Sequence, residues 1–265
     1  FPAISFNNDS DNLKVLELAN WGSVTWSNFY KAFAGCSNMD ITATDEATAN
    51  TGSVTQFTGA WQSCSSLTSF PLIDTSSGTN FSVTWQFCSS LTTFPLIDTS
   101  LGTNFFETWL SCSSLNSFPL LDTSSGTSFT GSWRNCSNLS SFPLIDTSSG
   151  TDFSYAWYSC SNLSSFPLID TSLGTNFFQT WYSCGSLSSF PLIDTSSGTI
   201  FSNTWRNCSS LTVLPLLSMG NMTNGATAFN GVILSTNSYS DLLVDIEMNN
   251  SAANVTFDGG GSKYD

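Results

Sequence analysis

The stretch FPLIDTSSGTNFSVTWQFCSSLTT, residues 70–93, recurs along the chain at a fixed period of 24 residues. No insertion interrupts the recurrence, so each copy occupies one equivalent coil of a repeat array. The sequence therefore predicts a solenoid in which every repeated position forms a column of like side chains. The tryptophan column is Trp61, Trp85, Trp109, Trp133, Trp157, Trp181 and Trp205, and the cysteine column is Cys64, Cys88, Cys112, Cys136, Cys160, Cys184 and Cys208.

The two halves of each unit predict two kinds of secondary structure. Phe81, Trp85, Cys88 and Leu91 have the spacing i, i+4, i+7 and i+10 of one apolar helix face, and Thr79 stands at the N-cap position. The other half, LTTFPLID at 91–98, is short and apolar and predicts a strand, although its proline removes one backbone donor. We expect an α/β solenoid with short parallel strands on one side and short helices on the other.

Both ends of the chain depart from the repeat, as expected where terminal coils must cover an open core. Residues 1–60 contain a degenerate unit and predict an N-terminal capping region. Residues 61–217 form the regular array. Residues 218–265, in which the pattern dissolves, predict a C-terminal cap.

The composition excludes several classes of function. Only five residues are basic and the net charge is −14, so the chain cannot neutralise phosphates and nucleic acid is not an expected partner. No apolar run approaches the ~20 residues of a transmembrane helix, so no membrane-spanning segment is predicted. Because histidine is absent, the usual proton shuttle is missing, and we expect no enzyme activity.

The repeated tryptophans and cysteines predict a core. Zinc sites place their ligands a few residues apart, and no C-x-x-C pair occurs. One cysteine per coil fits a small buried filler, with a disulfide between neighbouring coils as the alternative. The tryptophans lie on the same apolar face, with a carbohydrate-stacking ladder as the alternative. The predicted core residues are Trp85, Cys88, Trp109, Cys112, Trp133, Cys136, Trp157, Cys160, Trp181 and Cys184.

An aspartate also recurs once per coil, at the start of a DTSSG or DTSLG turn. Stacked carboxylates repel each other. Either each accepts hydrogen bonds from its own turn, or calcium binds between them as the one candidate cofactor. The turn is favoured because the GGxGxD spacing of calcium-binding coils is missing. The residues are Asp74, Asp98, Asp122, Asp146, Asp170 and Asp194.

The outward positions that differ between copies are the candidates for ligand binding. They lie one residue after each tryptophan and three residues before that position. Tyrosine and arginine occur there, and both are typical of binding hot spots. A fixed core under a varied face predicts a recognition surface, with neutral variation of a solvated face as the alternative. The candidates are Arg134, Tyr155, Tyr158, Tyr182 and Arg206.

The beginning FPAISFNN…LELANWGSVTWSNFYKAFAGCSNMDITATD, the units W-x-x-C-S-S-L-x-S-F-P-L-I-D-T-S and the ending SYSDLLVDIEMNNSAANVTFDGGGSKY together resemble the BspA-like leucine-rich-repeat surface proteins. That family is related to the mycoplasma-lipoprotein-type repeat and also occurs in phage genomes. The resemblance implies a right-handed leucine-rich-repeat-like solenoid, an extracellular location and no catalytic residues. Family units often have Met and Val where this chain has Trp and Gly, so its helix side is expected to be bulkier and more aromatic.

These observations leave three hypotheses of function. The first is a non-catalytic adhesion or recognition module on a cell surface, which binds a glycan or a protein of a host or neighbouring cell. The second is a receptor-binding domain of a phage tail fibre, on the virion surface. The third is a structural subunit of an extracellular filament or surface layer, built as a homo-oligomer, with glycans on its Ser/Thr-rich turns as an added alternative.

Overall fold

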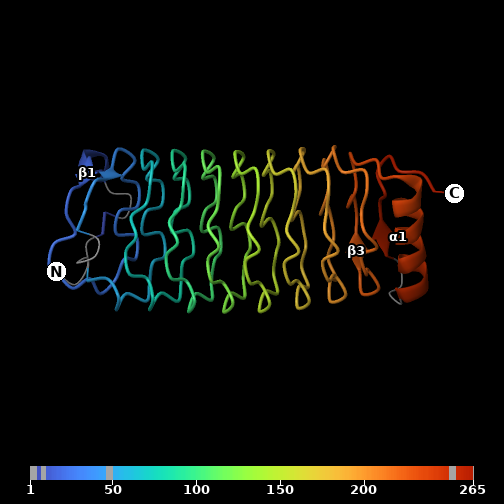
Figure 1. The fold of residues 1–265 in the computed structure, drawn as a ribbon, viewed down its shortest axis with the longest axis horizontal. Helices are drawn as coiled ribbons and strands as arrows, with labels where there is room; N and C mark the ends of the chain where they lie inside the picture. The colour runs from blue at the N-terminus through green and yellow to red at the C-terminus, as the bar shows by residue number, and fades with distance from the viewer. Residues whose placement is uncertain (1–4, 7–9, 46–49, 251–254, 265) are drawn as a thin grey trace.

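The computed structural model describes residues 5–6, 10–45, 50–250 and 255–264, and the other residues of the two predicted caps lie outside it. The protein is a solenoid whose coils stack in single file, with the two termini at opposite ends (Figure 1). Neighbouring coils meet through single parallel backbone bridges, such as Asn80 with Asn104 and Asn104 with Ser128. Regular strands occur near the ends, where β1 (Glu17–Leu18) pairs with β2 (Asp40–Ile41) and β3 (Asn224–Gly225) pairs with β4 (Thr256–Phe257), both in parallel.

The predicted row of helices is wrong, and the segment over 81–88 is a ladder of turns. The N–H groups of Thr84 and Cys88 bond to carbonyls three residues back, at 3.2 and 3.1 Å. The N–H groups of Phe81 and Trp85 instead donate to the next coil. Because alternate donors find partners outside the segment, the chain cannot keep the i to i−4 pattern of an α-helix. Thr79 therefore caps no helix, and its N–H and hydroxyl both donate to Thr55 O.

Residues with positive φ angles mark where each turn ladder reverses. In the tryptophan column that begins at Trp61, the positions two before and two after each tryptophan both adopt the left-handed conformation, as in Val83 at φ 51° and Phe87 at φ 62°. This region is rare for residues other than glycine and is strained for a β-branched one. The chain has glycine at the first of these positions in two coils, at Gly59 and Gly131.

The predicted strand over 91–98 is also wrong. Thr92 N–H donates to Thr68 O at 3.1 Å, but Pro95 has no N–H to donate. Ile97 N–H then bonds to Pro95 O at 3.0 Å, which closes a tight γ-type turn centred on Leu96. The turn directs Ile97 into the core and leaves Leu96 63% exposed.

Helical structure is confined to the two ends of the described chain. The 3-10 helix η1 (Asn12–Lys14) lies near the N-terminus, and α1 (Thr236–Asn249) lies across the C-terminal end of the solenoid (Figure 1). The Ser235 hydroxyl accepts the N–H of Ser238 at the start of α1, and Leu242 packs into the core. The sequence predicts a C-terminal cap at 218–265 without specifying its secondary structure, and α1 lies within that region.

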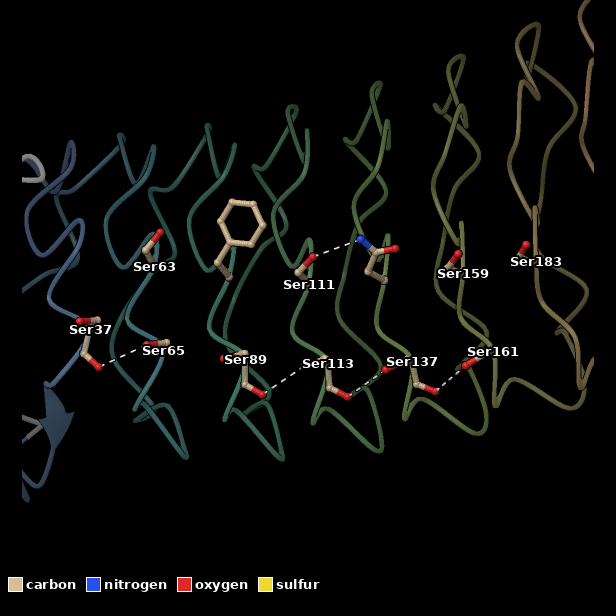
Figure 2. A pocket seen from close by; sticks show the side chains of 12 residues that line it. Ser37, Ser63, Ser65, Ser89, Ser111, Ser113, Ser137, Ser159, Ser161 and Ser183 are labelled. Atoms are coloured by element: carbon tan, nitrogen blue, oxygen red, sulfur yellow. Dashed lines mark hydrogen bonds between the residues drawn. The ribbon is translucent and has the colours of Figure 1, made fainter.

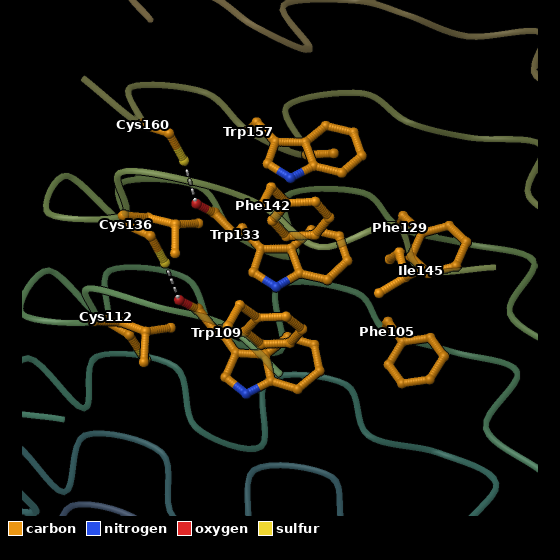
Figure 3. Close-up of a cluster of buried hydrophobic side chains, with 14 of the residues drawn as sticks. Phe105, Trp109, Cys112, Phe129, Trp133, Cys136, Phe142, Ile145, Trp157 and Cys160 are labelled. Atoms are coloured by element: carbon orange, nitrogen blue, oxygen red, sulfur yellow. Dashed lines mark hydrogen bonds between the residues drawn. The ribbon is translucent and has the colours of Figure 1, made fainter. Parts of the chain in front are cut away.

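The core is a column of stacked aromatic rings (Figure 3). The indoles of Trp109, Trp133 and Trp157 are fully buried and nearly parallel, with centroids 5.6 and 5.3 Å apart. Phe142 meets Trp133 and Trp157 edge to face, at 4.8 and 5.2 Å. The indole N–H groups of these tryptophans are buried and have no hydrogen-bond partner. Ring packing therefore holds the column together.

Buried hydroxyl and thiol groups link one coil to the next. Cys160 Sγ donates to Trp133 O of the preceding coil at 3.1 Å, and Cys136 repeats this contact with Trp109 (Figure 3). On another side of the coil the Thr99 hydroxyl donates to Asp122 O of the following coil at 2.5 Å. Because these donors are buried, each finds its hydrogen-bond partner in a backbone carbonyl of a neighbouring coil.

Candidate functional site

The five residues predicted as a recognition face come together on four successive coils. The Arg134 guanidinium lies 4.8 Å from the centre of the Tyr158 ring. Tyr158 stacks on Tyr182 at 4.7 Å with an angle of 2° between the ring planes. Arg206 lies 5.8 Å from the centre of the Tyr182 ring and closes the other end of the stack. The repeat places these residues one coil apart, so their side chains form a continuous column.

Tyr155 joins this column from the second varied position. Its ring centre lies 6.0 Å from that of Tyr158 and 5.1 Å from the Arg134 guanidinium. We call Arg134, Tyr155, Tyr158, Tyr182 and Arg206 the Arg–Tyr ladder. Sequence reasoning missed Phe178, which meets Tyr155 edge to face at 5.1 Å. Its signal is the appearance of Phe where most copies have Ser or Thr.

The two arginines are the only cations between residues 32 and 262, in a chain with a net charge of −14. Neither is in a salt bridge with a carboxylate in the described part of the chain. The Nε atoms of Arg134 and Arg206 are buried and have no hydrogen-bond partner, because the guanidinium groups lie over tyrosine rings. Such cation–π contacts hold the charge in place without neutralising it. The ladder is therefore a half-buried, positively charged patch on an acidic protein.

The ladder leaves little free ring face for a ligand to stack on. Tyr158 lies between Arg134 and Tyr182, and Tyr182 lies between Tyr158 and Arg206. Both faces of each ring are therefore in contact with a neighbour. The groups that remain available to a ligand are ring edges, phenol hydroxyls and guanidinium N–H groups. These can donate hydrogen bonds to an anionic or hydroxyl-bearing group.

The same column has a different chemistry in the N-terminal coils. Gln62 Nε2 donates to Gln86 Oε1 at 2.5 Å, and Gln86 Nε2 donates to Glu107 Oε2 at 2.7 Å. Gln86 and Leu110 are buried, at 6% exposure each. In these coils the side chains of the varied face bond to one another or are buried, so they are not available to a ligand. The accessible part of the varied face is the Arg–Tyr ladder.

A groove lined mainly by serines was not predicted. It runs along several coils beside the cysteine column, with a volume of about 780 Å³ (Figure 2). One row of hydroxyls donates across coils, as from Ser113 to Ser89 O at 3.5 Å and from Ser161 to Ser137 O at 3.4 Å. At least one serine stands next to every cysteine, and Cys64, Cys112 and Cys160 have one on both sides; this recurrence is the sequence signal for the groove. It is a neutral surface without a titratable group.

The predicted aspartate column lies in exposed turns. Asp74 Oδ1 accepts the N–H of Ser76 at 3.0 Å and its hydroxyl at 2.7 Å, and these bonds lower the pKa of Asp74 below its usual value. Hydrogen bonds from Ser148 and Ser196 lower the pKa of Asp146 and Asp194 in the same way. No group of three His, Cys, Asp or Glu side chains suited to a metal ion occurs in the described residues. The calcium alternative for Asp74, Asp98, Asp122, Asp146, Asp170 and Asp194 stays a prediction.

All eight cysteines are buried free thiols. Burial raises the pKa of Cys88, Cys136 and Cys208 to about 12. A thiol that stays protonated is a poor nucleophile and a poor metal ligand. The structure places the cysteines and tryptophans of the array in the core, away from the Arg–Tyr ladder.

The fold and the ladder define a repeat solenoid that presents a mixed aromatic and cationic patch. No protein-family model and no curated protein matches the chain. The structure is similar to an internalin (inlF) from Listeria monocytogenes strain 4b F2365, at 11% identity and a TM-score of 0.31, over 97% of this chain and 84% of that one. A likeness this weak carries no argument about function, and the resemblance to BspA-like proteins stays a prediction. Among the described residues, no helix is long and apolar enough to cross a membrane.

Proposed function

We propose that this protein is a non-catalytic recognition module of an extracellular surface, and that the Arg–Tyr ladder is its binding site. The observation that supports this most is the assembly of the ladder from outward positions that differ between otherwise similar coils. Tyr, Arg and Phe side chains gather in one patch there. Aromatic residues and arginine are the residues that carry most binding energy at interfaces. A surface rich in Ser and Thr and poor in lysine fits an extracellular setting.

The chemistry of the ladder favours a ligand with an anionic group. Arg134 and Arg206 have no carboxylate partner in the described chain, while the faces of Tyr158 and Tyr182 are covered. A carboxylate or sulfate can accept hydrogen bonds from the guanidinium and phenol groups together. The ligand class is therefore an acidic glycan or an acidic segment of a protein on a host or neighbouring cell.

A binding screen of the protein against cell surfaces and a panel of neutral and acidic glycans tests this proposal. We expect binding to acidic ligands, reduced by salt, and reduced about tenfold or more when Tyr158→Ala and Tyr182→Ala are combined. Gln62→Ala is the matched control, because Gln62 occupies the same column in a distant coil. Calcium is added in one arm and chelated in another to test the aspartate column.

Two results would contradict the proposal. If no surface or glycan binds under any condition, a structural role in a filament or surface layer becomes the better hypothesis. If binding occurs but is unchanged in the tyrosine double variant, the site lies elsewhere on the solenoid. Near-ultraviolet circular dichroism of the buried tryptophans shows whether each variant keeps its fold.

A further inference from the structure

A row of exposed leucines runs along another side of the solenoid, away from the varied position. Six of the leucines are the centre of the tight turn in FPLID or FPLLD, and Leu216 stands at the same position of the repeat in LPLLS. Each of the seven is 57–63% exposed. Phe rings of the same segment stand 5.7–6.1 Å apart from coil to coil, so the leucines form a closely spaced row. We call this row the leucine ridge; its members are Leu72, Leu96, Leu120, Leu144, Leu168, Leu192 and Leu216.

The interior of the fold does not explain these leucines. Their side chains point outward, while Ile97 and its equivalents fill the core. In the last coil the core Phe, the core Ile and the turn Asp are all replaced, by Leu214, Leu217 and Ser218, yet Leu216 is still leucine. Together the seven side chains form one exposed apolar strip along seven coils. An apolar patch of that size on a soluble protein is typical of an interaction surface.

Polar rows of opposite character flank the ridge. On the N-terminal side of the first six turns are exposed hydroxyls, of which Thr93 and Ser117 donate no hydrogen bond within the described chain. On the C-terminal side are the exposed aspartates. One carboxylate oxygen of Asp98 and Asp122 accepts bonds from its own turn, and the other accepts none there. Across the face the order is therefore hydroxyl donors, leucines, carboxylate acceptors.

We propose that the leucine ridge is the interface of a homodimer in which two copies lie side by side and parallel. A twofold axis along the ridge sets the leucines of one copy against those of the other. It also places the hydroxyl row of each copy opposite the aspartate row of its partner. A twofold axis across the ridge would instead align the two aspartate rows, which repel each other. The order of the rows thus selects the parallel arrangement.

A second copy fits the ridge for two further reasons. Its leucines have the same spacing, so the contact repeats from coil to coil without loss of register. The ridge extends over seven coils and its flanking hydroxyl and aspartate rows over six, so the contact would be one continuous strip along the array. The net charge of −14 on each copy opposes the pairing. Salt screens that repulsion, so the dimer strengthens as salt rises.

Sedimentation velocity of the full chain over a range of concentrations, at low and at high salt, measures the association. We expect a dimer that tightens with salt. Combining Leu120→Gln with Leu144→Gln removes four leucines from each dimer and weakens association by about 100-fold or more. The control combines Leu101→Gln and Leu173→Gln, at leucines 53% exposed but outside the ridge, and keeps the dimer. A wild-type chain that is monomeric at every concentration, or a dimer unaffected by the ridge variant, overturns the proposal.

Cysteine crosslinking tests the orientation. Leu72→Cys and Leu216→Cys mark opposite ends of the ridge, while the native thiols are buried. In a parallel dimer each variant crosslinks to itself under mild oxidation. In an antiparallel dimer the two variants crosslink only to each other when mixed, and that result overturns the parallel arrangement. The interface does not involve the Arg–Tyr ladder, so the tyrosine variants leave association unchanged.

Discussion

The substitution Gly131→Val tests whether the coil segments are turn ladders or helices, because the two structures predict effects of opposite sign. Gly131 has a φ of 62°, and a Cβ there would lie 3.0 Å from Glu107 Cγ. Holding an L-residue in the left-handed region costs about 1–2 kcal/mol. Loss of glycine freedom in the unfolded chain offsets about 0.4–1 kcal/mol of this. We expect a net loss of about 1 kcal/mol, whereas in a helix valine would be better than glycine by a few tenths.

Gly131→Asn is the matched control for this experiment. Asparagine tolerates the left-handed region, and Asn203 occupies the same column with a φ of 58°. It adds the same Cβ and removes the same glycine freedom, so the difference between the two variants isolates the backbone strain of valine. The midpoint of denaturant unfolding, followed by the near-ultraviolet signal of the tryptophans, measures both. A Val variant at least as stable as the Asn variant would refute the turn ladder.

Three other predictions follow from the contacts between coils. Thr123→Val leaves the carbonyl of Asp146 without its buried donor and lowers the free energy of unfolding by about 1–3 kcal/mol. The exposed control Thr127→Val changes the free energy of unfolding by about 0.5 kcal/mol or less. Equal losses in the two variants would contradict the role of the buried hydroxyl. The cysteines react with a chromophoric disulfide at pH 8 only after unfolding, because burial raises the pKa of Cys88, Cys136 and Cys208 to about 12; fast labelling of the native protein would contradict this. Folding lowers the pKa of Asp74, Asp146 and Asp194, so these carboxylates stabilise the fold above the usual pKa of about 4, and that stabilisation is lost as the pH falls through their folded pKa values. We expect Asp146→Asn to reduce the dependence of the free energy of unfolding on pH in this range, as measured by urea titrations. An unchanged dependence would contradict this.

The inward-facing columns were predictable because burial follows the spacing of apolar residues. Phe81, Trp85, Cys88 and Leu91 all face the core. The helix prediction failed on the same evidence, since a turn ladder and a helix both return to one face after three or four residues. They differ in where the backbone N–H groups bond. In this protein that depends on the next coil, which is 24 residues away and invisible to a local pattern.

The binding candidates were found from variation between copies, which needs no knowledge of secondary structure. Columns form at every repeated position whatever the local conformation, so Tyr158 and Tyr182 stack although their helix does not exist. The leucine ridge was not predicted, because the apolar content of LTTFPLID as a whole favoured a strand. The positions of its apolar residues indicate the ridge, since Phe94 and Ile97 face the core and Leu96 lies between them and faces outward.

The two surfaces differ in a way that bears on what each can bind. The Arg–Tyr ladder changes from coil to coil, so a ligand must match a particular order of side chains and can occupy only one register. The leucine ridge is the same in every coil, and a short ligand would bind it equally well at several registers. Only a partner with the same spacing over many coils gains from the whole ridge. Another copy of this solenoid has that spacing by construction, and its caps define where the register begins and ends.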